Sequence, residues 1–595
     1  MRELGKVFGL PVVEIEELIT FYKKIPPPTK IGELIYRYAE YLRDFPSYLS
    51  IHAGGILISE KPIYNYTATS MPPKGFPTAQ FSMIEAEDIG LNKFDILSQR
   101  GLGHIREVVD IVKDNRGVDI DIHQIDAFKK DPLIALHLNK GNTMGCFYVE
   151  SPAMRMLLFK LETNDYLGLV AASSIIRPGV AQSGMMRQYI LLHKHPEYRN
   201  TQHPVMLSIM PETYGVMVYQ EDVIKVANIF AGLDLGQADV LRRGMSGKYR
   251  SRDEFQRIKD QYYLNCKEKG YTEELAREIW RQIESFAGYS FAKGHSASFA
   301  VESYQSLYLK TYFPLEFMVG VINNFGGFYR TEFYVHEARI NGAIIEAPCV
   351  NNSRQFTSIK KKVIHLGFVH IDSLEKRTVA QLLTERESGG LFQSFDEFLQ
   401  RVAISLEQIL LLIRINAFRF TGKTKQELMW EAHFIINKRV KVPKGNELFP
   451  SRRTKKYALP SLDYDSREDM LDQLDLLGFT IEPAFKLLAN QQLEGIRARD
   501  LKKYHRQQVQ IIGQLVTLKP TRTVKGEGMY FGTFVDQEGQ WIDTVHFPPM
   551  AKKYPVRGSG CYLIRGKVAE EFGYYSLEVN YLERLGYWNR EDSKR

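Results

Sequence analysis

One aspartate and a neighbouring lysine are the residues whose types and spacing first suggest chemistry. Asp95 lies in the stretch 91–97 (LNKFDIL), between apolar neighbours and two residues after Lys93. The brief alternation predicts a short strand with Asp95 near its end and with Lys93 on the same face. A carboxylate there needs a cation, hydrogen-bond donors or a metal ion, because burying it unpaired costs several kcal/mol. On local grounds, an aspartate that caps the next helix explains the same residues.

Two basic junctions offer sites for phosphate groups. Arg242 and Arg243 precede Gly244, and arginine forks beside a glycine-bearing turn suit bidentate phosphate binding. Lys293 and His295 stand at the start of a predicted helix, where backbone N–H groups attract anions. Solvated surface arginines and a structural histidine are the competing interpretations of these residues.

A second acidic pair and a glycine pair have less specific explanations. Asp119 and Asp121 would share one face of a strand, the arrangement that two-metal chemistry requires. Their polar, loop-like surroundings favour a turn or a helix cap instead. Gly54 and Gly55 precede a short apolar strand at 56–58, where they permit close backbone approach or serve as a plain turn.

The composition is that of a soluble, multidomain protein. A chain of 595 residues with 44% apolar and 25% charged residues suggests about three to five domains. A net charge of +8 is compatible with nucleic acid without indicating it. The four cysteines are far apart, which favours neither disulfides nor zinc and points to the reducing cytoplasm. We expect no signal peptide and no membrane span, and the helical pattern at the first residues leads us to expect material upstream.

The elements that carry these residues change along the chain. Residues 140–325 are predicted to be mostly helical, as are 351–435, and a basic linker follows at 436–460. Alternating strands with glycine turns over 506–590 predict a small closed β-barrel. Aromatic side chains of this barrel could stack on bases or pack within the protein; they are Tyr530, Phe531 and Trp541.

Several longer motifs occur in a recognisable order. They are GCFYVESPAMR at 145–155, IRPG at 176–179, YGVMVYQE at 214–221, ADVLRR at 238–243 and FAGYSFAKGHSA at 286–297. Together they resemble the bacterial C-family DNA polymerase III alpha subunit (DnaE type) over essentially the whole chain. FPSYLSIH at 45–52 and NFGGFY at 324–329 are similar to the error-prone branch of that family in particular.

The resemblance implies a multidomain α+β architecture. Its expected parts are a partial thumb (1–46), the C-terminal part of the palm (47–110), large helical fingers (111–350), a helix-hairpin-helix-like domain (351–435), a basic linker with a candidate clamp-binding motif and a helical segment (436–505), and an OB-type barrel (506–590). In the hairpin at 371–376 the usual glycines are largely absent, which puts DNA contact there in doubt.

The resemblance also implies roles for individual residues. Asp95 corresponds to a catalytic, Mg²⁺-binding aspartate and Lys93 to a triphosphate contact. The residues expected near the incoming nucleotide are Arg242, Arg243, Lys293 and His295. Leu448 and Phe449 resemble the end of a sliding-clamp-binding motif. Asn92, Ser98, Gln99 and Val180 depart from the family's usual residues.

An absence limits this assignment. The family carries further catalytic aspartates in a Pro-Asp-x-Asp-x-Asp motif, after a histidinol-phosphatase-like (PHP) domain, and this sequence contains neither. Two Mg²⁺ ions need several carboxylates, so one aspartate should bind the pair poorly.

The resemblance therefore predicts the C-terminal portion of a DNA-directed DNA polymerase for replication or error-prone repair. Its expected partners are primed DNA, deoxynucleoside triphosphates, a sliding clamp and an N-terminal polymerase half. The alternative is a catalytically inactive remnant that binds DNA and the clamp.

Overall fold

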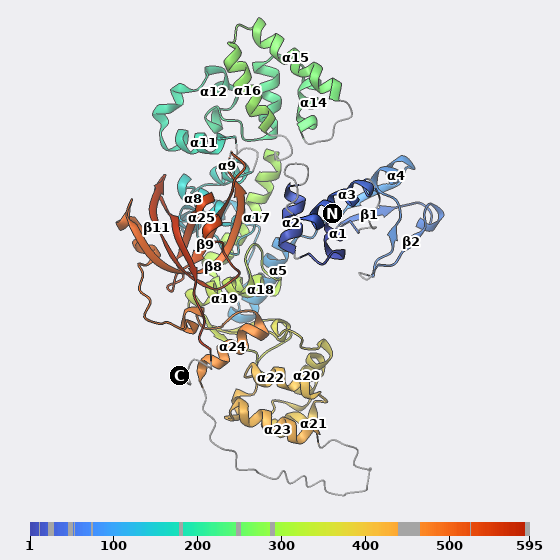
Figure 1. Ribbon diagram of the computed structural model, residues 1–595, viewed down its shortest axis with the longest axis vertical. Helices are drawn as coiled ribbons and strands as arrows, with labels where there is room; N and C mark the ends of the chain where they lie inside the picture. Colours follow the sequence, from blue (N-terminus) through green and yellow to red (C-terminus); the bar gives the residue numbers. More distant parts are fainter. Residues whose placement is uncertain are drawn as a thin grey trace. The chain divides into compact units, whose positions relative to one another are not determined.

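A computed structural model describes most of the chain in two compact units, Met1–Gln99 and Arg100–Arg595 (Figure 1). The described residues are 1–10, 12–21, 29–43, 45, 51–52, 54–72, 75–177, 183–245, 252–285, 292–437, 465–523 and 525–589. The architecture mixes helices and sheets, as the sequence predicts.

The first unit contains short helices and two small sheets. Its elements are α1 (Arg2–Val7), α2 (Val12–Phe21), α3 (Lys30–Tyr41), β1 (Gly55–Ile58), β2 (Thr69–Ser70), β3 (Thr78–Ala79), α4 (Met83–Asp88) and β4 (Asn92–Asp95). Helix α3 begins where the Thr29 side chain accepts a hydrogen bond from the Gly32 amide at 3.0 Å. Strand β4 confirms the predicted strand, with Asp95 as its last residue.

Strands β1 and β4 form an antiparallel pair with one apolar face. Ile56 lies opposite Phe94, and Leu57 lies opposite Lys93. The face that carries Ile56 and Phe94 is the apolar one. Its apolar side chains are 49–65% exposed; they are Ile56, Ile58, Phe94 and Ile96. A two-stranded sheet is marginal in water unless further strands or a helix cover its apolar face. The described part of this unit therefore has an apolar surface that is suited to burial.

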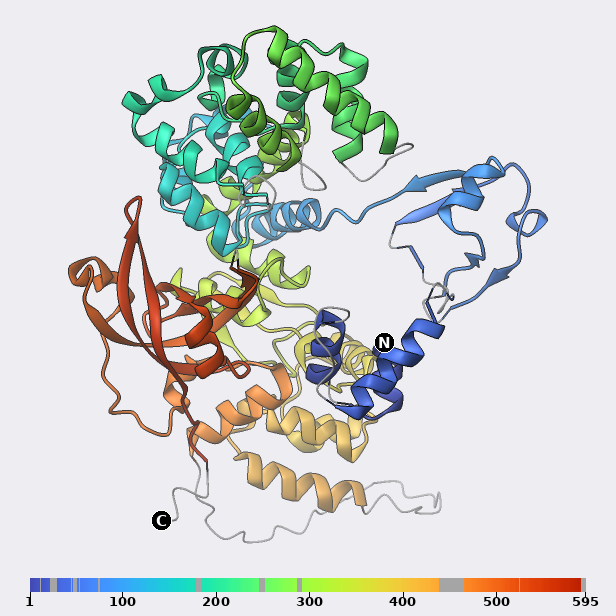
Figure 2. The ribbon, with the colours of Figure 1, turned by 45° about the horizontal axis from the view of Figure 1, so that its top comes forward.

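The second unit begins with a large helical body, in the range that the sequence predicts to be mostly helical (Figure 2). Its longest helix, α17 (Lys293–Tyr312), packs against α5 (Arg100–Arg116) and α18 (Pro314–Asn323). The other helices are α6 (Ile125–Lys129), α7 (Pro132–Asn139), α8 (Pro152–Leu161), α9 (Tyr166–Ile175), α11 (Met185–Lys194), α12 (Pro204–Ile209), α13 (Gln220–Lys225), α14 (Leu235–Met245), α15 (Arg252–Glu268), α16 (Glu273–Ser285) and α19 (Thr331–Ile340).

The boundary between the units lies at Gln99, whereas the sequence places the end of the palm at 110. Helix α5 runs without a break through that position, and its Ile105, Val108 and Val112 are buried in the core of the helical body. Burial of this helix face explains why the whole helix belongs to the second unit.

The two acidic residues that follow α5 form a turn. Asp119 is paired with Lys113 at 2.8 Å, and the Asp121 carboxylate accepts a hydrogen bond from the His123 amide at 3.0 Å. The turn interpretation of this pair is confirmed.

A second core lies in the segment that the sequence predicts to resemble a helix-hairpin-helix domain. Its helices are α20 (Lys376–Gly389), α21 (Phe395–Arg401), α22 (Leu406–Arg414) and α23 (Lys425–Asn437), with α24 (Ser466–Leu477) packed against α22. A small sheet precedes them, in the order β5 (Ile344–Glu346), β7 (Val363–His365), β6 (Ser358–Lys360).

The C-terminal segment forms the predicted closed barrel (Figure 1). Its strands are β8 (Gln508–Arg522), β9 (Gly528–Val535), β10 (Trp541–His546), β11 (Cys561–Glu571) and β12 (Tyr574–Arg584), closed in the order β10-β12-β11-β8-β9. Pairing is parallel between β10 and β12 and antiparallel between the other neighbours. A short helix, α25 (Pro548–Lys553), connects β10 to β11. Five strands in this order make an OB-like barrel.

Candidate functional site

Asp95 lies half-exposed at the end of β4 and is paired with a lysine. The Lys93 ammonium is 2.9 Å from Asp95 Oδ1 and donates a hydrogen bond to Oδ2 at 3.1 Å. This hydrogen bond lowers the pKa of the Asp95 carboxyl. The next helix, α5, begins only at Arg100, so Asp95 does not occupy its N-cap position. The pairing keeps a charged carboxylate accessible at the strand end.

The glycine pair before β1 allows a close approach to this strand end. A Cβ atom at Gly54 would lie 2.5 Å from the carbonyl oxygen of Ile96, and one at Gly55 would lie 2.8 Å from Lys93 Cε. Both contacts are shorter than real Cβ atoms tolerate. At Gly54 glycine is thus required by close backbone approach, one of the two explanations that the sequence allowed, whereas Gly55 is crowded only by the side chains of His52 and Lys93.

His52 is a neighbour of Asp95 that the sequence did not single out. Its Nδ1 accepts hydrogen bonds from the amides of Gly54 at 3.1 Å and Gly55 at 2.6 Å, and lies 3.7 Å from Asp95 Oδ1. A ring nitrogen that accepts carries no proton, so this contact is not an ion pair. The signal for His52 was the glycine pair at 54–55, separated from it by one residue, whose amides donate to its ring.

The described residues near Asp95 supply no second carboxylate for a pair of metal ions. Glu85 is engaged in a capping box with Ser82 at the start of α4. Throughout the described ranges, no cluster of three or more His, Cys, Asp or Glu side chains could hold a metal. A two-Mg²⁺ site needs several oxygen ligands around both ions. Asp95 is suited to be one ligand of such a site, but the described residues alone do not provide enough ligands for two Mg²⁺ ions.

In the second unit, Lys293 opens α17 and is held by two glutamates. Its ammonium forms an ion pair with Glu212 and lies 5.4 Å from the centre of the Tyr219 ring. Its backbone amide donates to both carboxylate oxygens of Glu221, at 3.1 and 3.0 Å. The hydrogen bond from Lys293 lowers the pKa of Glu212. The predicted anion site is therefore in contact with carboxylates of the protein itself.

His295, two residues after Lys293, lies near enough to Arg177 to be affected by its charge. The His295 ring lies 4.0 Å from the Phe299 ring, and burial followed by the nearby Arg177 charge lowers the pKa of His295. The Arg177 guanidinium donates to the Tyr148 hydroxyl and lies 5.1 Å from the centre of that ring. Arg177 and Tyr148 belong to quoted motifs, but the sequence did not identify them as neighbours of His295.

Of the two predicted arginines on α14, Arg242 contacts a carboxylate of its own helix. Arg242 Nε donates to Asp239 Oδ1 at 2.9 Å, one turn earlier on the helix. The side chain of Arg243 lies outside the described residues. Leu448 and Phe449 of the candidate clamp-binding motif also lie outside them.

The three aromatic residues of the barrel have different surroundings. Trp541 has the Arg155 guanidinium 3.9 Å from its ring centre, and the Tyr329 ring lies 5.4 Å away. Phe531 on the neighbouring strand is 45% exposed, and Tyr530 is partly buried. The geometry favours packing for Trp541 and leaves the Phe531 ring accessible.

Further contacts attach the barrel to the helical body. The loop between β11 and β12 lies against α8 and α11, where Lys160 is 2.5 Å from Glu571 and Lys194 donates to the Phe572 carbonyl at 3.3 Å. Beside Trp541, the partly buried Asp543 accepts hydrogen bonds from the hydroxyls of Thr533 and Tyr574. Burial raises the pKa of Asp543.

In the hairpin at 371–376, two backbone amides are bonded within the domain. The Asp372 amide donates to the Leu476 carbonyl, and the Glu375 amide donates to the Gln408 side chain, both at 2.8 Å. Ser373 adopts a left-handed φ of 61°, a conformation that glycine usually supplies. These two amides are therefore not available to a DNA phosphate in this conformation.

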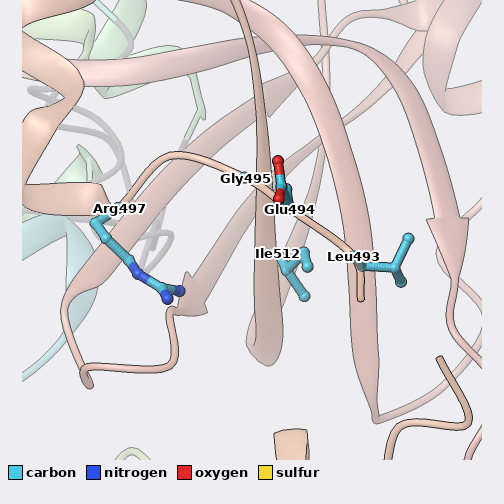
Figure 3. Close-up of a pocket in the computed structure, with 5 residues that line it drawn as sticks. All are labelled: Leu493, Glu494, Gly495, Arg497 and Ile512. Carbon is cyan, nitrogen blue, oxygen red and sulfur yellow. The ribbon is translucent and has the colours of Figure 1, made fainter. Parts of the chain in front are cut away.

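A hollow on the barrel surface is lined by two apolar residues, one glycine and two charged residues. Leu493, Glu494, Gly495, Arg497 and Ile512 line it (Figure 3). Arg497 lies 3.8 Å from Glu538, so its charge is already partly compensated.

No helix in the described ranges is long and apolar enough to cross a membrane.

Comparison with known families agrees with the motifs. Residues 2–98 match the model of the bacterial DNA polymerase III alpha NTPase domain, residues 101–270 the finger domain of the same subunit, and residues 342–428 a helix-hairpin-helix motif. The first two matches meet at the boundary between the structural units.

Curated relatives extend the similarity along the chain. The DNA polymerase III subunit alpha of Staphylococcus aureus (strain COL) is 28% identical over 617 residues, which covers 98% of this chain and 56% of the relative. The same subunit from Staphylococcus epidermidis (strain ATCC 35984) is 29% identical over 613 residues, with the same coverage. The chain thus spans about half the length of the curated relatives it matches. These matches support the bacterial DNA polymerase III alpha subunit family for this chain.

Proposed function

We propose that this chain is a C-terminal portion of a bacterial DNA polymerase III alpha subunit and acts in DNA-directed DNA synthesis together with an N-terminal half. The observation that carries the proposal is the Lys93–Asp95 pair at the end of β4, within a segment that matches the alpha subunit. Motif similarity further suggests the error-prone branch of the family.

In this proposal Asp95 supplies one of the carboxylates that a nucleotidyl-transfer site requires. Mg²⁺ ions, when bound, would provide charge stabilisation for the primer hydroxyl and the leaving pyrophosphate. Lys93 keeps the carboxylate charged and oriented through its 2.9 Å contact. The described residues contain no group of three or more His, Cys, Asp or Glu side chains that could hold a metal, and in this proposal the N-terminal half supplies the remaining ligands.

The apolar face of the β1–β4 pair supports the same partner. Ile56, Ile58, Phe94 and Ile96 are exposed on a sheet that has only two strands in the described residues. Burial of apolar area is favourable by about 25 cal/mol per Å², before the entropic cost of association is subtracted. An N-terminal half that packs a helix or a second sheet on this face would cover it and bring its carboxylates to Asp95.

The second unit supplies the proposed substrate contacts. Lys293 and His295 would contact the incoming deoxynucleoside triphosphate, with Arg177 as an added neighbour; Arg242 and Arg243 are proposed for the same role by family similarity. The exposed Phe531, with Tyr530, is the proposed stacking surface for template bases. Leu448 and Phe449 are proposed to bind a sliding clamp.

Primer extension tests the proposal. We expect the 595-residue chain with Mg²⁺, primed DNA and deoxynucleoside triphosphates to give no extension alone. Addition of an N-terminal half that carries the Pro-Asp-x-Asp-x-Asp motif should restore it. Asp95→Asn should abolish the restored activity, whereas Asp88→Asn, on α4 in the same unit, should leave it intact.

Two results would contradict the proposal. Extension by the isolated chain that survives Asp95→Asn would exclude Asp95 as a metal ligand. A complex with the N-terminal half that binds primed DNA but incorporates no nucleotide would point to a binding protein without catalysis.

A further inference from the structure

The N-terminal end of α17 brings cationic and anionic side chains from separate segments together. Lys293 and His295 belong to α17, and Arg177 follows α9. Glu212 lies on the short 3₁₀ helix η3 (Pro211–Thr213), and Glu221 lies on α13. The two glutamates contact the donors of Lys293 that a phosphate group would use, its ammonium and its backbone amide.

Glu221 has the geometry of a fixed helix cap. Its half-buried carboxylate binds the Lys293 amide through both oxygens. The next residue, Asp222, is buried and accepts hydrogen bonds from the amides of Val218 and Tyr219, each at 2.9 Å. These bonds hold the start of α13 in place, so Glu221 is constrained by its own helix.

Glu212 has the opposite properties. Its side chain is 62% exposed and belongs to a three-residue 3₁₀ helix, and the Lys293 side chain that it contacts is 39% exposed. An exposed ion pair contributes little free energy, about 0–1 kcal/mol. Glu212 can therefore exchange for another anion at low cost.

We propose that Glu212 is an internal counter-ion, which neutralises Lys293 in the nucleotide-free fingers and is displaced by the triphosphate of the incoming nucleotide. This inference rests on the proposed function, because it takes Lys293 as a nucleotide contact. Glu212 is a positioning residue that acts through Lys293 and does not itself touch the nucleotide.

The surroundings favour such an exchange. The Tyr219 ring lies 5.4 Å from the Lys293 ammonium, so a cation–π contact keeps that ammonium in place when the carboxylate leaves. Lys225 is close enough to contribute to the lowered pKa of Glu212, so the displaced carboxylate retains a cationic neighbour. A Cβ atom at Gly294 would meet nothing within 4 Å, which leaves open space beside the helix start.

Nucleotide binding to the complete chain tests this role. The probe is a deoxyadenosine triphosphate with a fluorescent methylanthraniloyl label, titrated with Mg²⁺ at low ionic strength. Glu212→Gln removes the competing charge and should tighten binding about two- to fivefold, the equivalent of one exposed ion pair. The gain should shrink at high salt, because salt screens exposed charges.

Matched variants separate the mechanism from general charge effects. Glu162→Gln removes the exposed partner of Lys194, at 3.0 Å on the same helical body, and should leave the affinity unchanged. In a Lys293→Ala background, Glu212→Gln should have no effect, because the two residues act as a pair.

The outcomes distinguish this inference from the proposed function. Unchanged or weaker binding in Glu212→Gln, while Lys293→Ala weakens binding, would overturn the counter-ion role alone. Absence of nucleotide binding by the unmodified chain, or binding that is insensitive to Lys293→Ala, would overturn the nucleotide site and the inference with it.

Discussion

The buried ion pair between Lys310 and Glu337 gives the sharpest test of how α17 is held. The Lys310 ammonium lies 2.8 Å from Glu337 Oε1 and donates to the Met144 carbonyl at 2.8 Å. The two side chains are only 2% and 10% exposed. The replacement Lys310→Met keeps the length of the side chain but leaves the Glu337 carboxylate buried without its cation.

The expected cost follows from this burial. Breaking a buried pair by removing one partner costs about 3–5 kcal/mol, because the remaining charge is uncompensated. For a body of this size, each kcal/mol shifts the melting temperature by about 2–4 °C. We therefore expect thermal unfolding, followed by calorimetry, to show the transition of the helical body lowered by roughly 6–20 °C.

The pH dependence adds a second signature. Lys310 is the main cause that lowers the pKa of Glu337 against its burial. A carboxylate with a lowered folded-state pKa stabilises the fold above its unfolded pKa, and this stability is lost as the pH falls through the folded pKa. As the pH is lowered and Glu337 becomes neutral, the free energy of unfolding of Lys310→Met should therefore rise relative to that of the unmodified chain.

Two controls make this result interpretable. Glu273→Gln removes an exposed pair with Arg277 on α16 and should cost no more than about 0.5 kcal/mol. The double variant Lys310→Met with Glu337→Leu should recover most of the loss, because no buried charge remains. A loss below about 1 kcal/mol in Lys310→Met, or no recovery in the double variant, would refute the reasoning.

Three further outcomes are expected. Gly54→Ala should destabilise the first unit, detected by faster limited proteolysis, because its Cβ atom would lie 2.5 Å from the Ile96 carbonyl oxygen; equal proteolysis would contradict this. Burial raises the pKa of Glu302 to about 7, so stability should fall as the pH rises from its unfolded pKa towards 7, and Glu302→Gln should flatten that fall in melting curves. Phe531→Ala should weaken single-stranded DNA binding by about 1–3 kcal/mol in a fluorescence titration, whereas loss of the packed Trp541 ring should chiefly lower barrel stability.

Local patterns in the sequence were sufficient for elements whose cause is local. Alternation around Asp95 and along 506–590 predicts β4 and the barrel strands, because successive side chains of a strand point to opposite faces; in barrel strand β10 one of these faces is buried. Glu150 illustrates the limit: its carboxylate accepts hydrogen bonds from the amides of Gly145 and Phe328. Two motifs quoted for the resemblance are thus joined by a structural contact that neither motif reveals alone.

The candidate site was less accessible to prediction because its contacts join distant segments. Nothing near Lys293 in the sequence indicates Glu212, which lies 81 residues away. Arg177 likewise reaches the vicinity of His295 only through the packing of α9 on α17. Residue types identified the cations, but only the fold identifies the anions that they meet.

The attachment of the barrel to the helical body fixes the distance between that attachment and the proposed stacking residue, Phe531. Trp541, at the fingers, and Val545, opposite Phe531, lie on the same face of β10. They are separated by four residues, or about 14 Å along the strand. If a base stacks on Phe531 as proposed, it would therefore keep a constant offset from the contact between Trp541 and Arg155, because both positions belong to one rigid barrel.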